Sequence, residues 1–194
     1  HGGNLSLLAM RDDREHLDAL LSEARRLSAK LLYVSNPNNP IGSWWTGREI
    51  AQMIADVPER TVLLLDEAYI DTAPAGTAPP VDVETPNVIR LRTFSKAYGL
   101  AGARIGYALG HRELIAAFEK VRNHYGINRV GQIGALAALH DQGYLAEVVA
   151  NIAAARLRIS NAALAAGLKP LLSAANFVAI DCGRDGAFAK RVLD

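Results

Sequence analysis

The sequence predicts an α/β fold built on a largely parallel sheet. Short apolar runs of strand length alternate along the chain with amphipathic helical patterns, which is typical of that class. The runs that begin near residues 31, 61 and 87 each end in a polar segment. Open α/β sheets gather their ligands where the strands end, so these segments are where we expect a site.

The first half of the chain contains two predicted helix–strand pairs. Leucines spaced on one helical face predict a helix over 13–29, followed by a strand over 31–35 and a turn rich in Asn and Pro. Thr46 and Glu49 have the spacing of a capping box and predict the start of a helix. A buried strand over 61–65 follows.

Beyond this strand, proline density predicts an exposed loop over 72–86. We then expect strands at 87–92, 104–109 and 176–181, and helices at 111–122, 129–140, 144–166 and 185–193. Gly167 is expected to end the long helix. We expect the strand at 176–181 to belong to a different, smaller unit, which places a domain boundary near 150 and predicts domains over 1–150 and 151–194.

Composition excludes several classes of protein. The 194 residues carry 21 basic and 20 acidic side chains, a balance that argues against nucleic acid as the main partner. No apolar run is long enough to span a membrane. The single cysteine, Cys182, cannot form an internal disulfide, and no Cys/His spacing indicates a metal site, so we expect a reducing, cytoplasmic setting. Because the chain opens at His1 and stops inside an expected helix, we expect it to be part of a longer protein.

Lys96 follows a predicted strand and lies in a loop of small residues. A shielded amine there could lose its proton and attack an aldehyde, although a lone lysine is more often an ordinary surface residue. Thr93, Ser95 and Arg104 are close in sequence and supply the hydroxyls and guanidinium that a phosphate needs. The alternative for Arg104 is pairing with a structural carboxylate.

Asp66 ends the predicted strand over 61–65, where a buried carboxylate needs a cation or donors facing it. A protonated pyridine nitrogen would be such a cation, and a structural helix cap is the alternative. Tyr69 could direct its phenol to the same place, or simply pack with its hydroxyl in solvent. Asn39 lies between prolines in a turn of fixed shape, although such turns are common without a ligand.

Together these segments resemble a known family, the class I and II aminotransferases of fold type I, and within it most resemble the histidinol-phosphate aminotransferases. The likeness covers nearly the whole chain in the order and spacing of three motifs: Asn36-Pro37-Asn38-Asn39-Pro40-Ile41-Gly42, Asp66-Glu67-Ala68-Tyr69, and the stretch from Ser95 to Tyr107. It implies that 1–150 is the later part of a three-layer α/β/α cofactor domain, and that 151–194 begins a small α+β C-terminal domain. It also implies a homodimer.

The resemblance further implies a cofactor, pyridoxal 5'-phosphate, and a role for each matching residue. Lys96 would form the aldimine with the cofactor and shuttle a proton, and Asp66 would pair with the pyridinium nitrogen. Asn39 and Tyr69 would bond the phenolic oxygen, while Thr93, Ser95 and Arg104 would hold the phosphate. The implied reaction transfers an amino group between a small-molecule amino donor and a 2-oxo acid.

Some features depart from the family pattern. Ile41 stands where the family usually has Thr, and Trp44-Trp45 is unusual for the turn. The family's glycine/serine phosphate loop and ring-stacking aromatic residue fall before His1, and its substrate-carboxylate arginine falls after Asp194. If these parts were missing from the protein, we would expect impaired turnover.

Three alternatives remain open at this point. An aromatic aminotransferase or a threonine-phosphate decarboxylase would use the same lysine, and a non-catalytic sensor domain could retain Lys96 and Asp66 without turnover. A plain nucleotide-binding domain is disfavoured, because neither a Gly-x-Gly-x-x-Gly nor a Walker loop is present.

Overall fold

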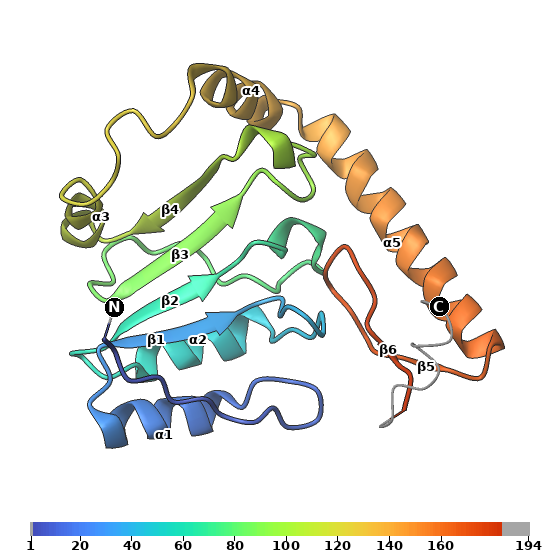
Figure 1. The fold of residues 1–194 in the computed structure, drawn as a ribbon, viewed down its shortest axis with the longest axis horizontal. Helices are drawn as coiled ribbons and strands as arrows, with labels where there is room; N and C mark the ends of the chain where they lie inside the picture. The colour runs from blue at the N-terminus through green and yellow to red at the C-terminus, as the bar shows by residue number, and fades with distance from the viewer. Residues whose placement is uncertain (1, 184–194) are drawn as a thin grey trace.

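The computed structural model describes residues 2–183. A four-stranded sheet lies at its centre, with helices at both ends of the chain flanking it (Figure 1). The helix expected over 185–193 lies outside the described residues. None of the helices within 2–183 is both long and apolar enough to cross a membrane.

The sheet is mixed, and its strand order follows the chain. β1 (Leu31–Ser35), β2 (Val62–Asp66) and β3 (Val88–Thr93) pair in parallel, and β4 (Gly106–Gly110) pairs antiparallel with β3. The α/β class with a mostly parallel sheet is therefore confirmed, and each strand lies within two residues of its predicted start. The carboxyl ends of β1, β2 and β3 lie at the same edge of the sheet (Figure 1).

One face of the sheet packs against α1 (Leu17–Leu27) and α2 (Gly47–Asp56). Alternate strand residues point to this face and form the main core with the apolar stripes of both helices. Its buried members include Leu21, Ile50, Leu63 and Leu65. On the opposite face, within 2–183, the side chains of Leu31 and Tyr33 are 62% and 55% exposed.

The two helices begin as their caps dictate. The predicted capping box is confirmed, since Thr46 accepts from the Glu49 backbone and the Glu49 side chain bonds back to Thr46. The helix predicted over 13–29 is shorter than expected. It begins at Leu17 because His16 caps it, with Nδ1 accepting from the backbone N–H of Ala19 at 3.2 Å.

Glu15, which precedes this helix, makes contacts outside it. The Glu15 carboxylate accepts from the side chain of Asn38 at 2.7 Å and from the backbone N–H of Ser35. It therefore fastens the segment before α1 to the turn that follows β1.

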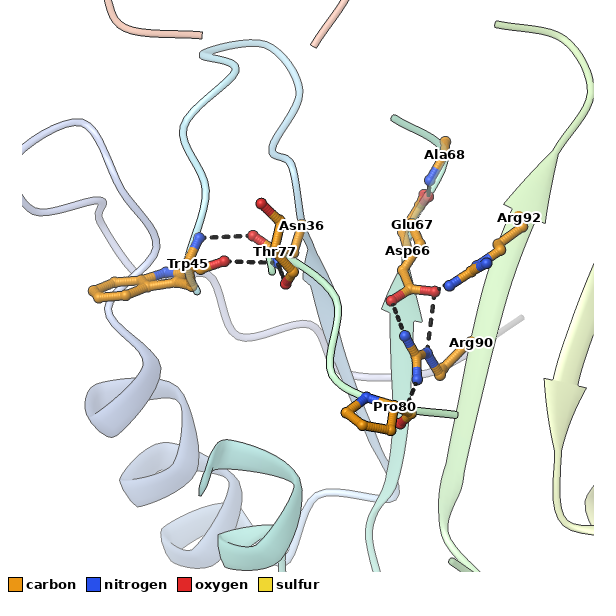
Figure 2. A network of polar contacts seen from close by, with 9 residues as sticks. All are labelled: Asn36, Trp45, Asp66, Glu67, Ala68, Thr77, Pro80, Arg90 and Arg92. Atoms are coloured by element: carbon orange, nitrogen blue, oxygen red, sulfur yellow. Dashed lines mark hydrogen bonds and ion pairs between the residues drawn. The ribbon is translucent and has the colours of Figure 1, made fainter. Parts of the chain in front are cut away.

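The loop predicted to be exposed over 72–86 is partly buried, so that prediction was wrong in its first half. Thr72, Thr77 and Pro79 are buried. Asn36, in the turn after β1, donates to the carbonyl of Thr77 at 3.4 Å, and Arg90 donates to the carbonyl of Pro80 at 3.0 Å (Figure 2). Buried backbone groups find partners in this way, so the loop can pack against the sheet.

Helices dominate the last third of the chain. α3 (Arg112–Phe118) is shorter than expected, while α4 (Arg129–His140) matches its prediction and α5 (Gln142–Ala165) starts two residues early. Gly167, at φ +74°, ends α5 as predicted. The strand expected over 176–181 is reduced to β6 (Ile180–Asp181), which pairs with β5 (Lys169–Pro170). Residue 150 falls inside α5, and a division of the chain there remains a proposal.

The segment after α5 returns to the carboxyl edge of the sheet. The Arg156 guanidinium donates to the carbonyls of Thr72 at 3.0 Å and Ala175 at 2.7 Å. Ala174 donates its N–H to the carbonyl of Gly42 at 2.8 Å. Gly42 has φ +88°, and a Cβ there would lie 2.2 Å from Ser173 Oγ, so only glycine allows this approach.

A buried ion network joins β2 to β3. Glu67 is 1% exposed and accepts from Arg90 at 2.6 Å and 3.0 Å, in bidentate geometry, and from Arg92 at 2.8 Å (Figure 2). The register pairs Leu65 with Arg90, so the network lies on the same face of the sheet as the core. The sequence analysis did not predict this network, although Glu67 lies in the Asp66-Glu67-Ala68-Tyr69 motif.

Neutralising Glu67 is expected to leave Arg90 as an uncompensated buried cation. Glu67→Gln should therefore lower the free energy of unfolding by about 3–5 kcal/mol, measured by urea denaturation. The matched control is Glu119→Gln, which breaks an exposed pair with Arg122 and should change little. Equal effects of the two substitutions would contradict a structural role for the Glu67 network.

Glu15 is expected to make stability fall as pH rises. Burial raises the pKa of this carboxyl above 4.5, so the folded state holds the proton more tightly than the unfolded state. Its stabilising contribution is complete below about pH 4.5 and is lost as pH rises through the folded-state pKa. Glu15→Gln should gain stability relative to the wild type between about pH 4 and pH 7.

Glu49 supplies a control of opposite sign. Hydrogen bonds from Thr46 lower the pKa of Glu49, so its contribution is present above about pH 4.5 and is lost as pH falls. Glu49→Gln should lose stability relative to the wild type over the same rise in pH. Parallel pH profiles for wild type and Glu15→Gln would contradict the prediction for Glu15.

Candidate active site

The three polar segments expected to form a site lie at the ends of three adjacent parallel strands. Side-chain contacts join one residue from each segment. Asn39 Nδ2 donates to Tyr69 Oη at 2.8 Å, and Lys96 Nζ lies 4.9 Å from the centroid of the Tyr69 ring. The sequence placed these three residues in one site, and the structure brings them into contact.

The turn after β1 presents Asn39 by fixing its neighbours. Asn36 is buried and bonds the backbone of Trp45 in both directions, donating at 3.2 Å and accepting at 2.8 Å (Figure 2). Asn38 is also buried and accepts from the N–H of Ile41 at 3.2 Å. Asn39 itself is exposed and keeps its amide for Tyr69. Sequence reasoning named Asn39 alone among the three asparagines, and it did not predict the contacts that Asn36 and Asn38 make.

Tyr69 is the centre of the site. Its side chain is 6% exposed and packs edge-to-face on Phe177, with ring centroids 5.3 Å apart. Its hydroxyl is held by Asn39, so the alternative of a hydroxyl in solvent is wrong. Sequence reasoning missed Phe177, because nothing local links a residue after α5 to a tyrosine more than a hundred positions earlier.

Asp66 is the last residue of β2 and is half-buried, less than expected for the end of a buried strand. Asp66 is less buried because its side chain does not point toward the core. Residues 63 and 65 face α1 and α2, and Asp66 points to the opposite face. Its Oδ1 accepts from the N–H of Ala68 at 2.9 Å and its Oδ2 accepts from Tyr33 Oη at 2.8 Å. Sequence reasoning did not single out Tyr33.

Lys96 lies in the loop after β3 and is half-buried. Its ammonium faces the Tyr69 ring, an attractive cation–π arrangement. Within residues 2–183, no carboxylate lies within ion-pair distance of Nζ, so the amine is not committed to a salt bridge. Gly99, at φ +70°, donates its N–H to the Lys96 carbonyl and closes the turn that carries the lysine.

The three remaining candidates surround this turn. Thr93 Oγ1 accepts from the N–H of Ser95 at 3.1 Å, so these two residues lie side by side. Arg104 is exposed, and its guanidinium donates to the carbonyl of Ala101 at 2.9 Å. Among the described residues it bonds neither Thr93 nor Ser95, and it pairs with no carboxylate. The structure therefore places Arg104 near the end of the same loop without joining it to the other two.

The site thus combines an uncommitted amine, a carboxylate with fixed orientation, a phenol held by an amide, and two hydroxyls, with an exposed guanidinium farther along the same loop. An amine of this kind can form a covalent bond to an aldehyde. The carboxylate can stabilise a cation, and the phenol and amide can bond an oxygen anion. This donor set suits a ligand that carries an aldehyde, a basic ring nitrogen and an anionic oxygen.

Known proteins are similar to this chain in sequence and in fold. The family model for aminotransferase class I and II matches residues 9–194. An aromatic amino acid aminotransferase from Rhodococcus opacus is 41% identical over 91% of the chain and 50% of its own length. A histidinol-phosphate aminotransferase from Bacillus velezensis is 39% identical over 94% of the chain and 52% of its own length.

The crystal structure of histidinol-phosphate aminotransferase from Sinorhizobium meliloti in complex with pyridoxal-5'-phosphate superposes with a TM-score of 0.95. The two proteins are 51% identical, and the matched region covers all of this chain and 53% of the Sinorhizobium meliloti chain. The chain therefore spans about half the length of the relatives it matches. With the family model matching nearly every residue, the chain belongs to the class I and II aminotransferases.

Proposed function

We propose that the protein uses pyridoxal 5'-phosphate to transfer an amino group from a small-molecule donor to a 2-oxo acid. The observation that carries the proposal is the contact of Asn39, Tyr69 and Lys96 at the strand edge where Asp66 also lies. Family membership and the cofactor named for the Sinorhizobium meliloti structure support it.

The residues present fit this cofactor. Lys96 offers an amine that no carboxylate in residues 2–183 holds, as attachment to an aldehyde carbon requires. Asp66 keeps acceptor capacity on both oxygens after its two hydrogen bonds, so it can also bond a protonated ring nitrogen. When bound, the cofactor supplies an electron sink for the negative charge that develops at the substrate carbon.

Each residue then has a distinct task. Lys96 would hold the cofactor through its amine and, when that amine is free, would accept the proton of the substrate α carbon as a general base. Asp66 keeps the ring nitrogen protonated. Asn39 and Tyr69 bond the phenolic oxygen, and Thr93, Ser95 and Arg104 bind the phosphate, for which the exposed guanidinium of Arg104 must turn away from Ala101.

We propose histidinol phosphate as the amino donor. The supporting observation is the 51% identity to the Sinorhizobium meliloti histidinol-phosphate aminotransferase, over all of this chain. The lone cysteine supports a reducing, cytoplasmic setting.

We also propose that the protein works as a homodimer, with no nucleic-acid or membrane partner. Large apolar side chains on and before α4 are exposed in the single chain, as a surface that a second copy covers would be. They include Val121, Val130, Ile133 and Leu136.

Borohydride reduction followed by peptide mass mapping tests the cofactor and its lysine. After incubation with pyridoxal phosphate, the wild type should carry a reduced pyridoxyl group on Lys96, and Lys96→Ala should lose both that adduct and the cofactor absorbance. Lys120→Ala removes an exposed lysine after α3 and serves as the control that should keep both. An adduct confined to other lysines would overturn the assignment of Lys96.

Substrate choice is tested with the same preparation. Histidinol phosphate should convert the bound cofactor to its amine form in a single turnover, and a 2-oxo acid should reverse the change. Faster conversion by phenylalanine would favour an aromatic aminotransferase, and carbon dioxide release from threonine phosphate would favour a decarboxylase. Adduct formation without conversion by any donor would favour a sensor domain.

Asp66→Ala is expected to slow proton removal far more than it weakens substrate binding. Losing the carboxylate beside the ring nitrogen removes charge stabilisation that matters most in the transition state, a loss on the order of 100-fold or more in rate. Stopped-flow absorbance at saturating donor measures that rate, and its concentration dependence gives the substrate affinity. Asp82→Ala, in the loop after β2, is the control; a similar rate for Asp66→Ala and the control would make Asp66 structural.

A further inference from the structure

Tyr33 lies on the face of the sheet that carries the site. It is the central residue of β1, and it points away from the core on the same side as Ser35. The register pairs Tyr33 with Leu64 and Ser35 with Asp66, so Tyr33 and Asp66 are diagonal neighbours on this face. A tyrosine side chain spans that diagonal, and its Oη donates to Asp66 Oδ2 at 2.8 Å.

This hydrogen bond completes the fixation of the Asp66 carboxylate. The Ala68 backbone holds Oδ1 and the Tyr33 phenol holds Oδ2, so neither rotation of the side chain nor exchange of its oxygens is free. Each carboxylate oxygen has two acceptor positions. The two donors therefore occupy one position on each oxygen and leave the others for a further partner.

The phenol remains a donor at every pH at which the protein would work. Partial burial and the hydrogen bond to the Asp66 carboxylate raise the pKa of Tyr33 to about 12. The ring itself is 55% exposed and belongs to neither core cluster of the described residues. Its contact with Asp66, rather than packing, is what distinguishes it from the other apolar residues of β1.

We infer that Tyr33 is a positioning residue for Asp66, holding the carboxylate in the orientation that receives the protonated ring nitrogen of the cofactor. The inference rests on the proposed function, because it assigns a partner to Asp66. Tyr33 acts through the carboxylate and needs no contact with cofactor or substrate.

A double-mutant cycle on cofactor affinity tests this inference. Four proteins are compared: wild type, Tyr33→Phe, Asp66→Ala and the double variant, with pyridoxal phosphate titrated into each apoprotein. Tyr33→Phe keeps the ring and should weaken the cofactor Kd about tenfold, the equivalent of ~1.4 kcal/mol for a hydrogen bond to a charged group. In the Asp66→Ala background the same change should have no effect, because the acceptor is gone.

Two spectroscopic readouts separate positioning from general structural loss. With ¹⁵N-labelled cofactor, the ring-nitrogen resonance should move toward its unprotonated position in Tyr33→Phe. In apoprotein with ¹³C-labelled tyrosine, Asp66→Ala should lower the pKa of Tyr33 below about 12, because the facing carboxylate is removed. Tyr125→Phe, which alters a tyrosine that is 95% exposed, is the control for all measurements.

The outcomes separate the role of Tyr33 from the role of Asp66. If Asp66→Ala weakens the cofactor Kd but Tyr33→Phe does not, or if Tyr33→Phe costs the same with and without Asp66, Tyr33 is not a positioning residue. If Asp66→Ala leaves both the cofactor Kd and the ¹⁵N resonance unchanged, the proposed role of Asp66 is wrong, and the inference on Tyr33 falls with it.

Discussion

The carboxyl end of β2 depends on one buried carboxylate. Glu67 follows the strand directly and is enclosed by the guanidinium groups of Arg90 and Arg92 from β3, while Arg90 also reaches the Pro80 carbonyl (Figure 2). Burying such charges is costly unless every partner is in place, so the network tolerates only one arrangement of strand, neighbour and loop. The network therefore ties the end of β2, the neighbouring strand β3 and the loop at Pro80 together at this edge of the sheet.

Because successive side chains of a strand point to opposite faces of the sheet, the structural ion network and the candidate site lie on different faces. Glu67, Arg90 and Arg92 face the helices, where α1 and α2 form the core. Asp66 is displaced from Glu67 by one residue and points to the other face, as do Tyr33 and Ser35 in the adjacent strand. A single dipeptide, Asp66-Glu67, therefore supplies both the candidate reactive carboxylate and the structural one, and a one-residue slip would exchange them.

The features that the sequence predicted well are those encoded locally. Strand starts came from apolar runs, the beginning of α2 came from Thr46 and Glu49, and the end of α5 came from Gly167. The meeting of Asn39, Tyr69 and Lys96 was predicted because parallel strands must end at one edge. The sequence motifs added the expectation that these three residues act together.

The features that were missed depend on contacts between distant segments. Phe177 reaches Tyr69 only because the chain folds back after α5, and Tyr33 reaches Asp66 only through the register of two strands. The loop expected to be exposed is partly buried because Asn36 and Arg90 supply partners for its carbonyls. No periodicity or propensity along the chain contains that information.

Arg156 ties α5 to the segment that follows β2 and to the segment that returns after the helix. This helix has 24 residues and is about 36 Å long, and Arg156 grips the carbonyls of Thr72 and Ala175 at a point about 20 Å from its N-terminal end. The Ala174–Gly42 hydrogen bond extends the same linkage to the turn that carries Asn39, so the helix and this turn are joined through the carbonyls of Thr72, Ala175 and Gly42.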